Sequence, residues 1–414
     1  MPLIIYIISL ISYFIILCLR KRLGFIYYQL AIAIVYLFSL SYIQTLDVTL
    51  IFYSIFSSLP YLKYFSIKNN ISVFFFIYFS LIILYSTIIN GVTDALSIFI
   101  IRLIGIIYYN YIFNHIKYDQ TKREQPTHNK DKHLLIIFLT GELILTTIGV
   151  ILSGGFGRLM LNYQCTVGNI SICGILICGS ALNSIKKQEK KSQHLSQIFF
   201  IWLLILIFTF LSIFSGTRGY IIVCLGMSLI YIVLFLTRFT KILIFLILAL
   251  PMIMFGDSIV EHSIDNLGFK NSTGRRSSEN QFVIQYMPNS PIHMLFGYGF
   301  GKKVKTLPDY TSYIHRVADT SYTNYILPEV SGFHNLYITI YYSSGIIGLA
   351  TISLMFFYII STLLKNSDKK LAIILVSYII LYMILLWFRW TATSGILEFA
   401  TLQYIIMKDK KHEK

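Results

Sequence analysis

The sequence predicts an all-α, polytopic membrane protein with about 12–13 transmembrane helices. Of the 414 residues, 56% are hydrophobic and only 13% are charged, whereas soluble globular chains carry about 25% charged residues. The mean hydropathy is +0.71. The apolar residues occur in long runs separated by short basic clusters, as membrane spans and their connecting loops do. These observations exclude an ordinary soluble enzyme and a disordered or collagen-like chain.

The spans are defined by apolar runs near the length that crosses the hydrocarbon core as a helix, about 20 residues. In chain order they cover residues 2–19, 23–44, 46–62, 71–90, 94–114, 133–152, 162–185, 197–215, 219–237, 240–256, 334–364, 371–391 and 395–407. The first ten spans therefore occupy residues 1–256 and the last three occupy 334–407. The first run precedes Arg20-Lys21-Arg22 and follows no cation, the reverse of a signal peptide, so we interpret it as an uncleaved span.

Lysine and arginine residues assign the two sides of the membrane, because they are enriched in cytoplasmic loops. With the N-terminus outside, the short outside loops hold only Arg158 and Arg218. The inside clusters lie at residues 20–22, 63–68, 117–132, 186–191, 238–241 and 365–370 and in the basic tail, 408–414. This alternation predicts a cytoplasmic C-terminus. It also accounts for the net charge of +16 without a nucleic-acid partner.

One outside loop, residues 257–333, is too long to be a simple connection between spans. Its hydrophobic residues predict an amphipathic helix near 277–287 that Pro288 and Pro291 end. A glycine-rich turn, Gly297-Tyr298-Gly299-Phe300-Gly301, follows. We expect this extracytoplasmic loop to fold onto the outer membrane face.

Charged residues inside predicted spans mark either pairing between helices or function, because an unpaired charge is costly in lipid. We interpret Glu142 and Glu398 as structural pairs. For Arg102 and Arg389, pairing and contact with a substrate headgroup both stay open.

The sequence predicts neither a metal site nor a cofactor. All five cysteines lie inside apolar runs, at spacings that fit neither a disulfide framework nor a zinc site. The long outer loop contains no Asp-x-Asp pair that would suggest a metal.

Arginines next to glycines on the outer side are candidate phosphate ligands. They are Arg158 after Ser153-Gly154-Gly155-Phe156-Gly157, Arg218 in Ser215-Gly216-Thr217-Arg218-Gly219, and Arg275 and Arg276 after Gly274. A guanidinium binds phosphate bidentately, and glycine lets a ligand approach the backbone. Alternatively, such side chains extend to lipid phosphates. We interpret Arg218, Arg275 and Arg276 as ligand contacts, and for Arg158 both interpretations stay open.

His334 is the candidate base, because it lies where the outer loop becomes a span. A neutral imidazole there can accept a proton near pH 7. We interpret the other outer histidines, His262, His293 and His315, as surface residues.

Three groups of residues on the outer side resemble the motifs of a known family. They are Ser215-Gly216-Thr217-Arg218-Gly219, Gly274-Arg275 with Leu295-Phe296-Gly297-Tyr298-Gly299, and His334-Asn335-Leu336-Tyr337 with Gly345-Ile346-Ile347-Gly348-Leu349. Their order, their common membrane face and the one large loop before the last spans resemble the O-antigen polymerase (Wzy) and O-antigen ligase superfamily. The resemblance covers residues 130–364, and the first five spans only by hydropathy.

The resemblance implies a GT-C-like glycosyltransferase that takes a glycan from undecaprenyl diphosphate without a metal. Polymerases of this family transfer the growing chain to the next lipid-linked repeat unit, and ligases transfer it to lipid A-core. The lipid-linked donor and acceptor and the bilayer are the implied partners, and a chain-length regulator is a further candidate.

On the donor side, the resemblance implies cations that stabilise the departing diphosphate, as fixed charges can. Arg218 and one of the pair Arg275 and Arg276 would do this, and the doubled arginine leaves open which one matches the family. Arg158 is a candidate helper.

On the acceptor side, the resemblance implies that His334 is the base or orients the acceptor. Asn335 would hydrogen-bond a sugar or hold the imidazole ring, and Tyr298 would stack on a sugar face.

We predict a polymerase of the Wzy type and keep two alternatives open. An O-antigen ligase has the same chemistry with another acceptor. A flippase for lipid-linked oligosaccharide would be expected to show internal repeats and midplane sites, whereas here the candidate residues gather at the outer surface. A purely structural subunit would leave the outer Arg and His residues unexplained.

Overall fold

The computed structural model describes residues 11, 15, 18, 70–91, 135–144, 146–147, 161–187, 195–214, 218–237, 280, 283–285, 287, 290–300, 302, 304–305, 329–330, 335–387, 401–402 and 405. Within this part the chain is helical, apart from turns and one pair of two-residue strands. The predicted spans at 23–44, 46–62, 94–114 and 240–256 lie outside the described residues, so the number of spans stays a prediction.

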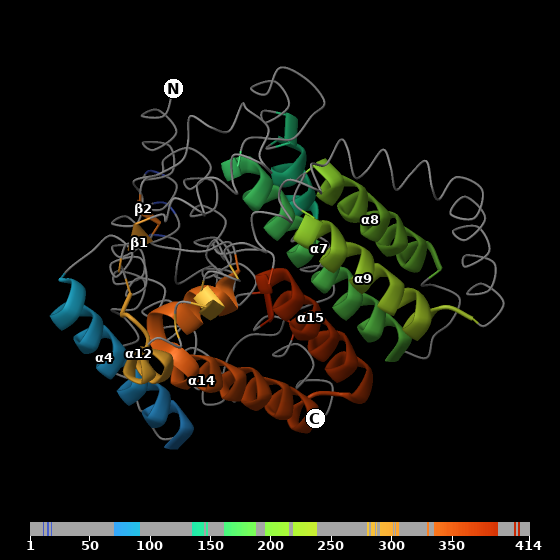
Figure 1. The fold of residues 1–414 in the computed structure, drawn as a ribbon. Helices are drawn as coiled ribbons and strands as arrows, with labels where there is room; N and C mark the ends of the chain where they lie inside the picture. The colour runs from blue at the N-terminus through green and yellow to red at the C-terminus, as the bar shows by residue number, and fades with distance from the viewer. Residues whose placement is uncertain are drawn as a thin grey trace, which may run out of the picture.

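The long helices of the described part coincide with predicted spans (Figure 1). They are α4 (Asn70–Asn90), α7 (Leu161–Lys187), α8 (Leu195–Phe214), α9 (Arg218–Phe235), α14 (Leu336–Asn366) and α15 (Lys369–Trp387). Among the described residues, two stretches are long and apolar enough to cross a membrane, Val167–Ile185 and Leu336–Lys365. The helical part of the predicted fold class is therefore confirmed for these residues.

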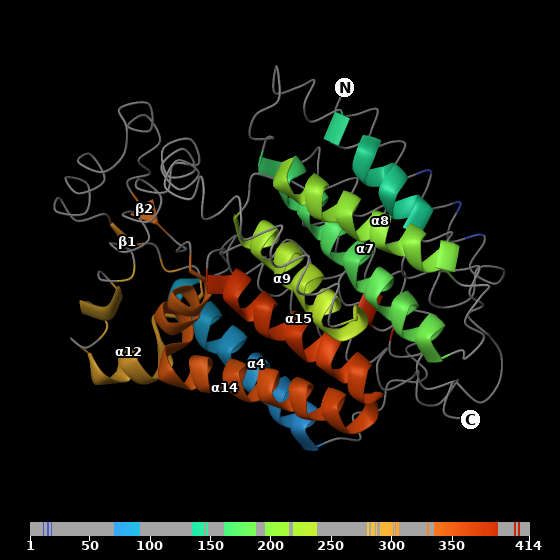
Figure 2. The same cartoon turned by 90° about the vertical axis from the view of Figure 1, so that its right-hand side faces the viewer.

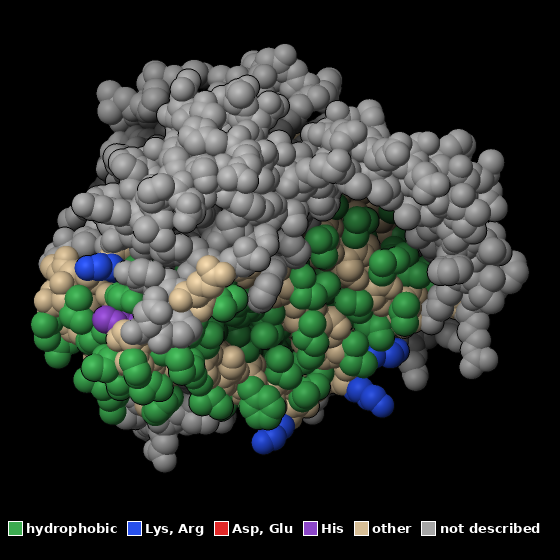
Figure 3. All heavy atoms as spheres, in the orientation of Figure 1, with side chains coloured by type: hydrophobic (Ala, Val, Ile, Leu, Met, Phe, Trp, Pro, Cys, Tyr) green, Lys and Arg blue, Asp and Glu red, His purple; other side chains and the backbone are tan. Residues whose placement is uncertain are grey.

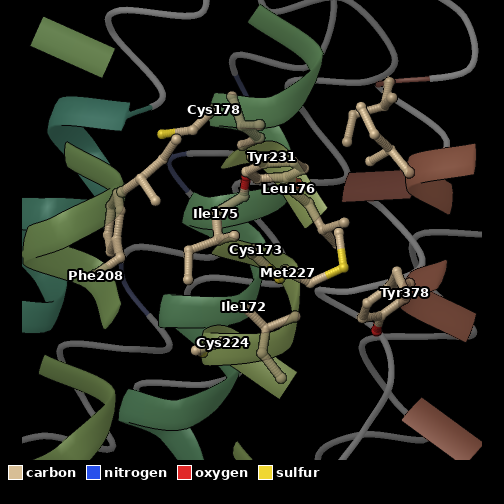
Figure 4. Packing of buried hydrophobic residues seen from close by; sticks show 14 of the residues in the cluster. Ile172, Cys173, Ile175, Leu176, Cys178, Phe208, Cys224, Met227, Tyr231 and Tyr378 are labelled. Atoms are coloured by element: carbon tan, nitrogen blue, oxygen red, sulfur yellow. The ribbon is translucent and has the colours of Figure 1, made fainter. Parts of the chain in front are cut away.

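Helix α7 forms the centre of the largest hydrophobic core. Its residues from Val167 to Ile185 are buried, and α8, α9 and α15 pack around it (Figure 2). Aromatic rings lie against its glycines: a Cβ at Gly174 would meet the ring of Phe208, and one at Gly179 would meet that of Tyr231. The Tyr231 hydroxyl donates to the carbonyl oxygen of Ile175 at 3.1 Å (Figure 4). Small residues thus let the surrounding helices approach α7 closely.

Large apolar side chains are exposed on several of the described helices. Ile88 on α4, Phe199 on α8 and Phe357 on α14 are 74%, 72% and 71% exposed. Figure 3 shows a face on which the described side chains are mostly hydrophobic, with lysine and arginine near its edges. Helices that are apolar on both their buried and their exposed faces suit an apolar solvent.

Helix α14 differs from the continuous span predicted at 334–364. Gly345 adopts φ 65° and ψ −163°, which breaks the helix into an outer segment, Leu336–Ser344, and a longer inner segment. A positive φ is accessible to glycine at little cost and is unfavourable for other residues. The break changes neither the length nor the hydropathy of the run, so hydropathy could not reveal it.

The outer loop contains a short helix that the sequence analysis did not anticipate, α12 (Pro291–Phe296). Pro291 lies in its first turn, where a missing N–H costs nothing, and the Ser290 side chain accepts from the backbone N–H of His293. Pro291, expected only to end a helix, therefore begins one. Further along, β1 (Val304–Lys305) pairs antiparallel with β2 (Glu329–Val330).

The described part of the predicted amphipathic helix near 277–287 has one buried and one exposed face. Asn280 and residues 283–285 are helical. Val283 and Met287 are fully buried, and Ile284 between them is 56% exposed. The two buried side chains form a small core with Tyr342 of α14, so this part of the loop packs on α14.

Glu142 lies buried among the helices, and it accepts a hydrogen bond from the Ser171 hydroxyl of α7. Its described partner is thus a hydroxyl on another helix. Arg102, Arg389 and Glu398 lie outside the described residues.

Candidate functional site

The structure places some of the predicted site residues and leaves others outside its described part. Asn335 and Tyr298 are described with their side chains, and Arg218 is described as the first residue of α9. Arg158, Arg275, Arg276 and His334 lie outside the described residues, so their roles stay predictions.

Asn335 is the N-cap of α14. Its Oδ1 accepts hydrogen bonds from the backbone N–H groups of Tyr337 at 2.9 Å and Ile338 at 3.4 Å. The side chain is 1% exposed, and within the described part of the chain its Nδ2 has no hydrogen-bond partner. A buried amide nitrogen without a partner is costly. Asn335 therefore caps the helix with its oxygen, and among the described residues both N–H donors of its Nδ2 lack a partner.

The glycine-rich loop, residues 297–300, fills the break in α14. The backbone N–H of Tyr298 donates to the carbonyl of Tyr342 at 2.8 Å, and that of Gly299 donates to the carbonyl of Ser343 at 3.0 Å. These carbonyls precede Gly345, where a continuous helix would have supplied their donors. The loop thus supplies the hydrogen bonds that the break removes.

The two backbones meet too closely for any side chain between them. A Cβ at Gly297 would collide with the backbone of Ser343 and Ser344. A Cβ at Gly345 would collide with the carbonyl of Leu295 and the N–H of Phe296. Both glycines have positive φ, 73° and 65°. The glycines of two separate motifs are therefore explained by one contact.

The C-terminal end of α4 holds the same loop from another side. The Tyr85 hydroxyl donates to the carbonyl of Gly297 at 2.8 Å. The Asn90 amide donates to the carbonyls of Tyr298 at 2.9 Å and Phe300 at 3.3 Å. The sequence analysis missed these residues, because one polar side chain at a span end carries no distinctive signal.

Tyr298 lies in a stack of rings. Its ring is 3.9 Å from that of His293 with planes 13° apart, and 5.1 Å from that of Tyr342 with planes 27° apart. Two rings nearly parallel to a third cannot share one face of it, so both faces of Tyr298 are covered. Sugar stacking on Tyr298 would require one of these neighbours to move. His293, interpreted as a surface residue, is part of this stack.

Helix α15 connects the start of α14 to the start of α9. The Tyr337 hydroxyl donates to the carbonyl of Met383 at 3.0 Å. Two residues further along α15, Leu385 lies against Gly219, where a Cβ would collide with its side chain. In both ribbon views α15 lies between α9 and α14 (Figures 1 and 2). The backbone of Arg218 and the capping residue Asn335 are thus anchored to the same end of α15.

These contacts gather segments from distant parts of the sequence at one end of the helices. The first residues of α9, the glycine-rich loop, the first turn of α14 and the end of α4 all belong to the predicted outer side. The described part of the site offers a free amide donor and an aromatic stack. Among the described residues, no group of three or more His, Cys, Asp or Glu side chains could hold a metal ion.

Among the comparisons with known proteins, the match to a family model agrees with the motifs. No curated protein matches the chain. Residues 202–353 match the family model Wzy_C, described as O-antigen ligase. The match includes the starts of α9 and α14, the glycine-rich loop and Gly345. Together with the exposed apolar helices, the match indicates an integral membrane protein.

The match also indicates the general activity. The family comprises glycosyltransferase-like enzymes, O-antigen ligases and polymerases of lipopolysaccharide biosynthesis that use lipid-linked oligosaccharides. The resemblance predicted from the motifs is thereby confirmed: residues 202–353 match the Wzy_C model, consistent with the O-antigen polymerase and ligase superfamily.

Proposed function

We propose that the protein is a polysaccharide polymerase of the Wzy type. It joins oligosaccharide repeat units carried on undecaprenyl diphosphate, at the outer face of the bacterial inner membrane, to build O-antigen or capsule. The observation that carries the proposal is the convergence of the starts of α9 and α14 on one end of α15, inside the region matched by the family model. This convergence supports a shared site for residues of two motifs that are far apart in the sequence.

The proposed reaction transfers a glycan between two lipid-linked molecules without a metal. An acceptor hydroxyl oxygen bonds to the anomeric carbon of the donor, and the bond from that carbon to the diphosphate oxygen breaks. The hydroxyl proton goes to His334, and the electron pair leaves with undecaprenyl diphosphate. Arg218 and one of Arg275 and Arg276 stabilise the departing charge, assisted by Arg158. Asn335 donates to a substrate oxygen, and Tyr298 lines the site with the edge of its ring.

The proposed membrane arrangement is a GT-C-like polytopic fold of about 12–13 spans, with an outside N-terminus and a cytoplasmic C-terminus. Contacts among the described residues support the grouping of these segment ends on two sides. The end of α4 and the start of α14, both expected outside, meet the outer loop. The end of α7 and the turn before α15, both expected inside, are joined by a hydrogen bond from Asn183 to Asp368.

An O-antigen ligase is the second candidate, because the matched family model carries that description. It would use the same donor chemistry and transfer the glycan to lipid A-core. The difference lies in the acceptor, so only products can separate the two reactions.

A deletion strain tests the proposal. Surface glycan is separated on a gel, and the lipid-linked pool is extracted alongside. Loss of a polymerase should leave lipid A-core carrying a single repeat unit. Bare core with long polymer still on the lipid carrier would instead identify a ligase. Single units retained on the cytoplasmic face would identify a flippase and contradict the proposed site.

The variant His334→Ala should reduce polymer formation at least about 100-fold, the lower range for loss of an acid–base group. The measurement is complementation of the deletion strain, with the amount of inserted protein determined by immunoblot. Normal chain lengths at normal protein levels would remove His334 from the mechanism.

The variant Arg218→Lys should lose most of its activity although its charge is retained, because a lysine ammonium cannot replace the bidentate fork of a guanidinium. We expect a rate reduction of about tenfold or more, equivalent to about 1.4 kcal/mol. The rate is measured with lipid-linked repeat units extracted from the deletion strain. Full activity in Arg218→Lys would show that the site needs only a positive charge there.

A further inference from the structure

We propose that the end of α4 positions the catalytic site: Ser86 and Asn90 hold the glycine-rich loop in the break of α14 and thereby fix the outer segment of α14. This inference rests on the proposed function, and it assigns a role to a helix outside the region matched by the family model, residues 202–353. Neither residue is expected to touch substrate, so both are positioning residues.

The hydrogen bonds between α4 and the loop use both backbone donors and backbone acceptors. Asn90 donates its amide to the carbonyls of Tyr298 and Phe300. Ser86 is fully buried and accepts from the N–H of Phe300 at 2.9 Å, while its own hydroxyl donates to Ile82 at 2.7 Å. A Cβ at Gly299 would meet the Asn90 amide nitrogen at 2.7 Å. The loop is therefore in close contact with α4 at Gly299.

The other side of the loop supports the broken helix. Tyr298 and Gly299 donate to the carbonyls of Tyr342 and Ser343, so the loop lies between α4 and the outer segment of α14. That segment begins at the Asn335 cap, directly after His334. Any shift of the loop relative to α4 must move these hydrogen bonds or break them. The placement of the residues proposed to bind substrate therefore depends on the position of α4.

The same loop also connects the two proposed halves of the site. It follows Arg275 and Arg276 in the chain and contacts the segment that follows His334. Rate loss is steep when bound groups are misplaced: an error of about 1 Å can cost about 100-fold. We call the contacts of Ser86 and Asn90 with the glycine-rich loop the latch. Because the latch fixes both segments to one helix, its loss is expected to lower kcat more than it changes KM.

The test compares Asn90→Asp and Ser86→Ala with the control Thr87→Ala in the full chain, purified into lipid nanodiscs. Asp has the size of Asn but lacks the donor and faces two carbonyl oxygens. The Thr87 hydroxyl donates to Ile83 within α4, so its removal tests the helix without the latch. Hydrogen–deuterium exchange of residues 297–300 reports the loop, and transfer of extracted lipid-linked repeat units reports activity.

We expect faster amide exchange in the loop for Asn90→Asp and Ser86→Ala, with kcat lowered about tenfold or more and KM changed less than about threefold. Asn90→Gln, which restores an amide donor, should recover part of the rate. Thr87→Ala should behave like the wild type in both measurements. Unchanged exchange in both variants would overturn the latch itself.

Faster exchange with unchanged kcat would show a latch that positions nothing functional, and would also overturn the proposal. Absence of transfer by the wild-type protein, with the exchange pattern as expected, would instead count against the proposed polymerase function. The exchange measurement therefore separates failure of the positioning role from failure of the function.

Discussion

Replacing Gly345 by alanine is expected to destabilise the folded protein by about 3 kcal/mol or more and to abolish polymer formation. Two costs add. A non-glycine residue at φ 65° and ψ −163°, a region that essentially only glycine reaches, costs about 1–3 kcal/mol. The added Cβ would also overlap the Leu295 carbonyl and the Phe296 N–H, which belong to backbone and cannot rotate away. Forced overpacking costs about 1–3 kcal/mol.

Gly91 provides the matched control for Gly345. It also has a positive φ, 70°, but nothing lies within 4 Å of the position of a Cβ there. Gly91→Ala should therefore show only the conformational cost of about 1–2 kcal/mol and keep its activity. Thermal unfolding in nanodiscs and transfer of lipid-linked repeat units measure both variants. Equal destabilisation of the two would show that the contact between the loop and the break in α14 contributes nothing.

The helices could largely be predicted from the sequence, because hydropathy over about 20 residues reflects the thickness of the membrane. The run at 71–90 corresponds to α4 at Asn70–Asn90, and the run at 219–237 corresponds to α9 at Arg218–Phe235. The family resemblance could also be predicted, since it depends on the order of short motifs.

The interruption of α14 could not be predicted in the same way. A single residue with positive φ leaves the length and the hydropathy of an apolar run unchanged, and glycine also occurs within continuous spans. The sequence analysis singled out both Gly297-Tyr298-Gly299 and Gly345 as motifs without a reason to join them. Their contact shows that the backbone N–H groups of Tyr298 and Gly299 supply the hydrogen bonds that the break at Gly345 removes.

The site itself was predicted by residue type rather than by geometry. Asn335 was identified by its place after His334, and the structure adds that its oxygen is already committed to the helix cap. Tyr298 was identified as a sugar platform, and the structure adds that both of its faces are covered by rings. Such details depend on contacts between distant segments, which no local pattern contains.

Variants of Asn335 should separate its structural role from its role toward substrate. Asp and Ser are also good N-caps, so both should preserve the hydrogen bonds to the start of α14. Neither offers the free amide donor. Asp also places a second oxygen at a buried position that is proposed to face substrate oxygens. We expect Asn335→Asp to lower the transfer rate about 100- to 1,000-fold, as loss of a donor to developing charge does.

Stability is the second measurement of this series. Asn335→Asp and Asn335→Ser should unfold near the wild-type temperature, because the cap is kept. Asn335→Ala should lose about 0.5–2 kcal/mol of stability together with its activity, because it loses both the cap and the donor. Wild-type turnover in the Ser variant would show that Asn335 is a cap and nothing more. Ser and Asp variants that are both stable and inactive would assign the Nδ2 of Asn335 to the reaction, since both keep the cap and both lack the amide donor.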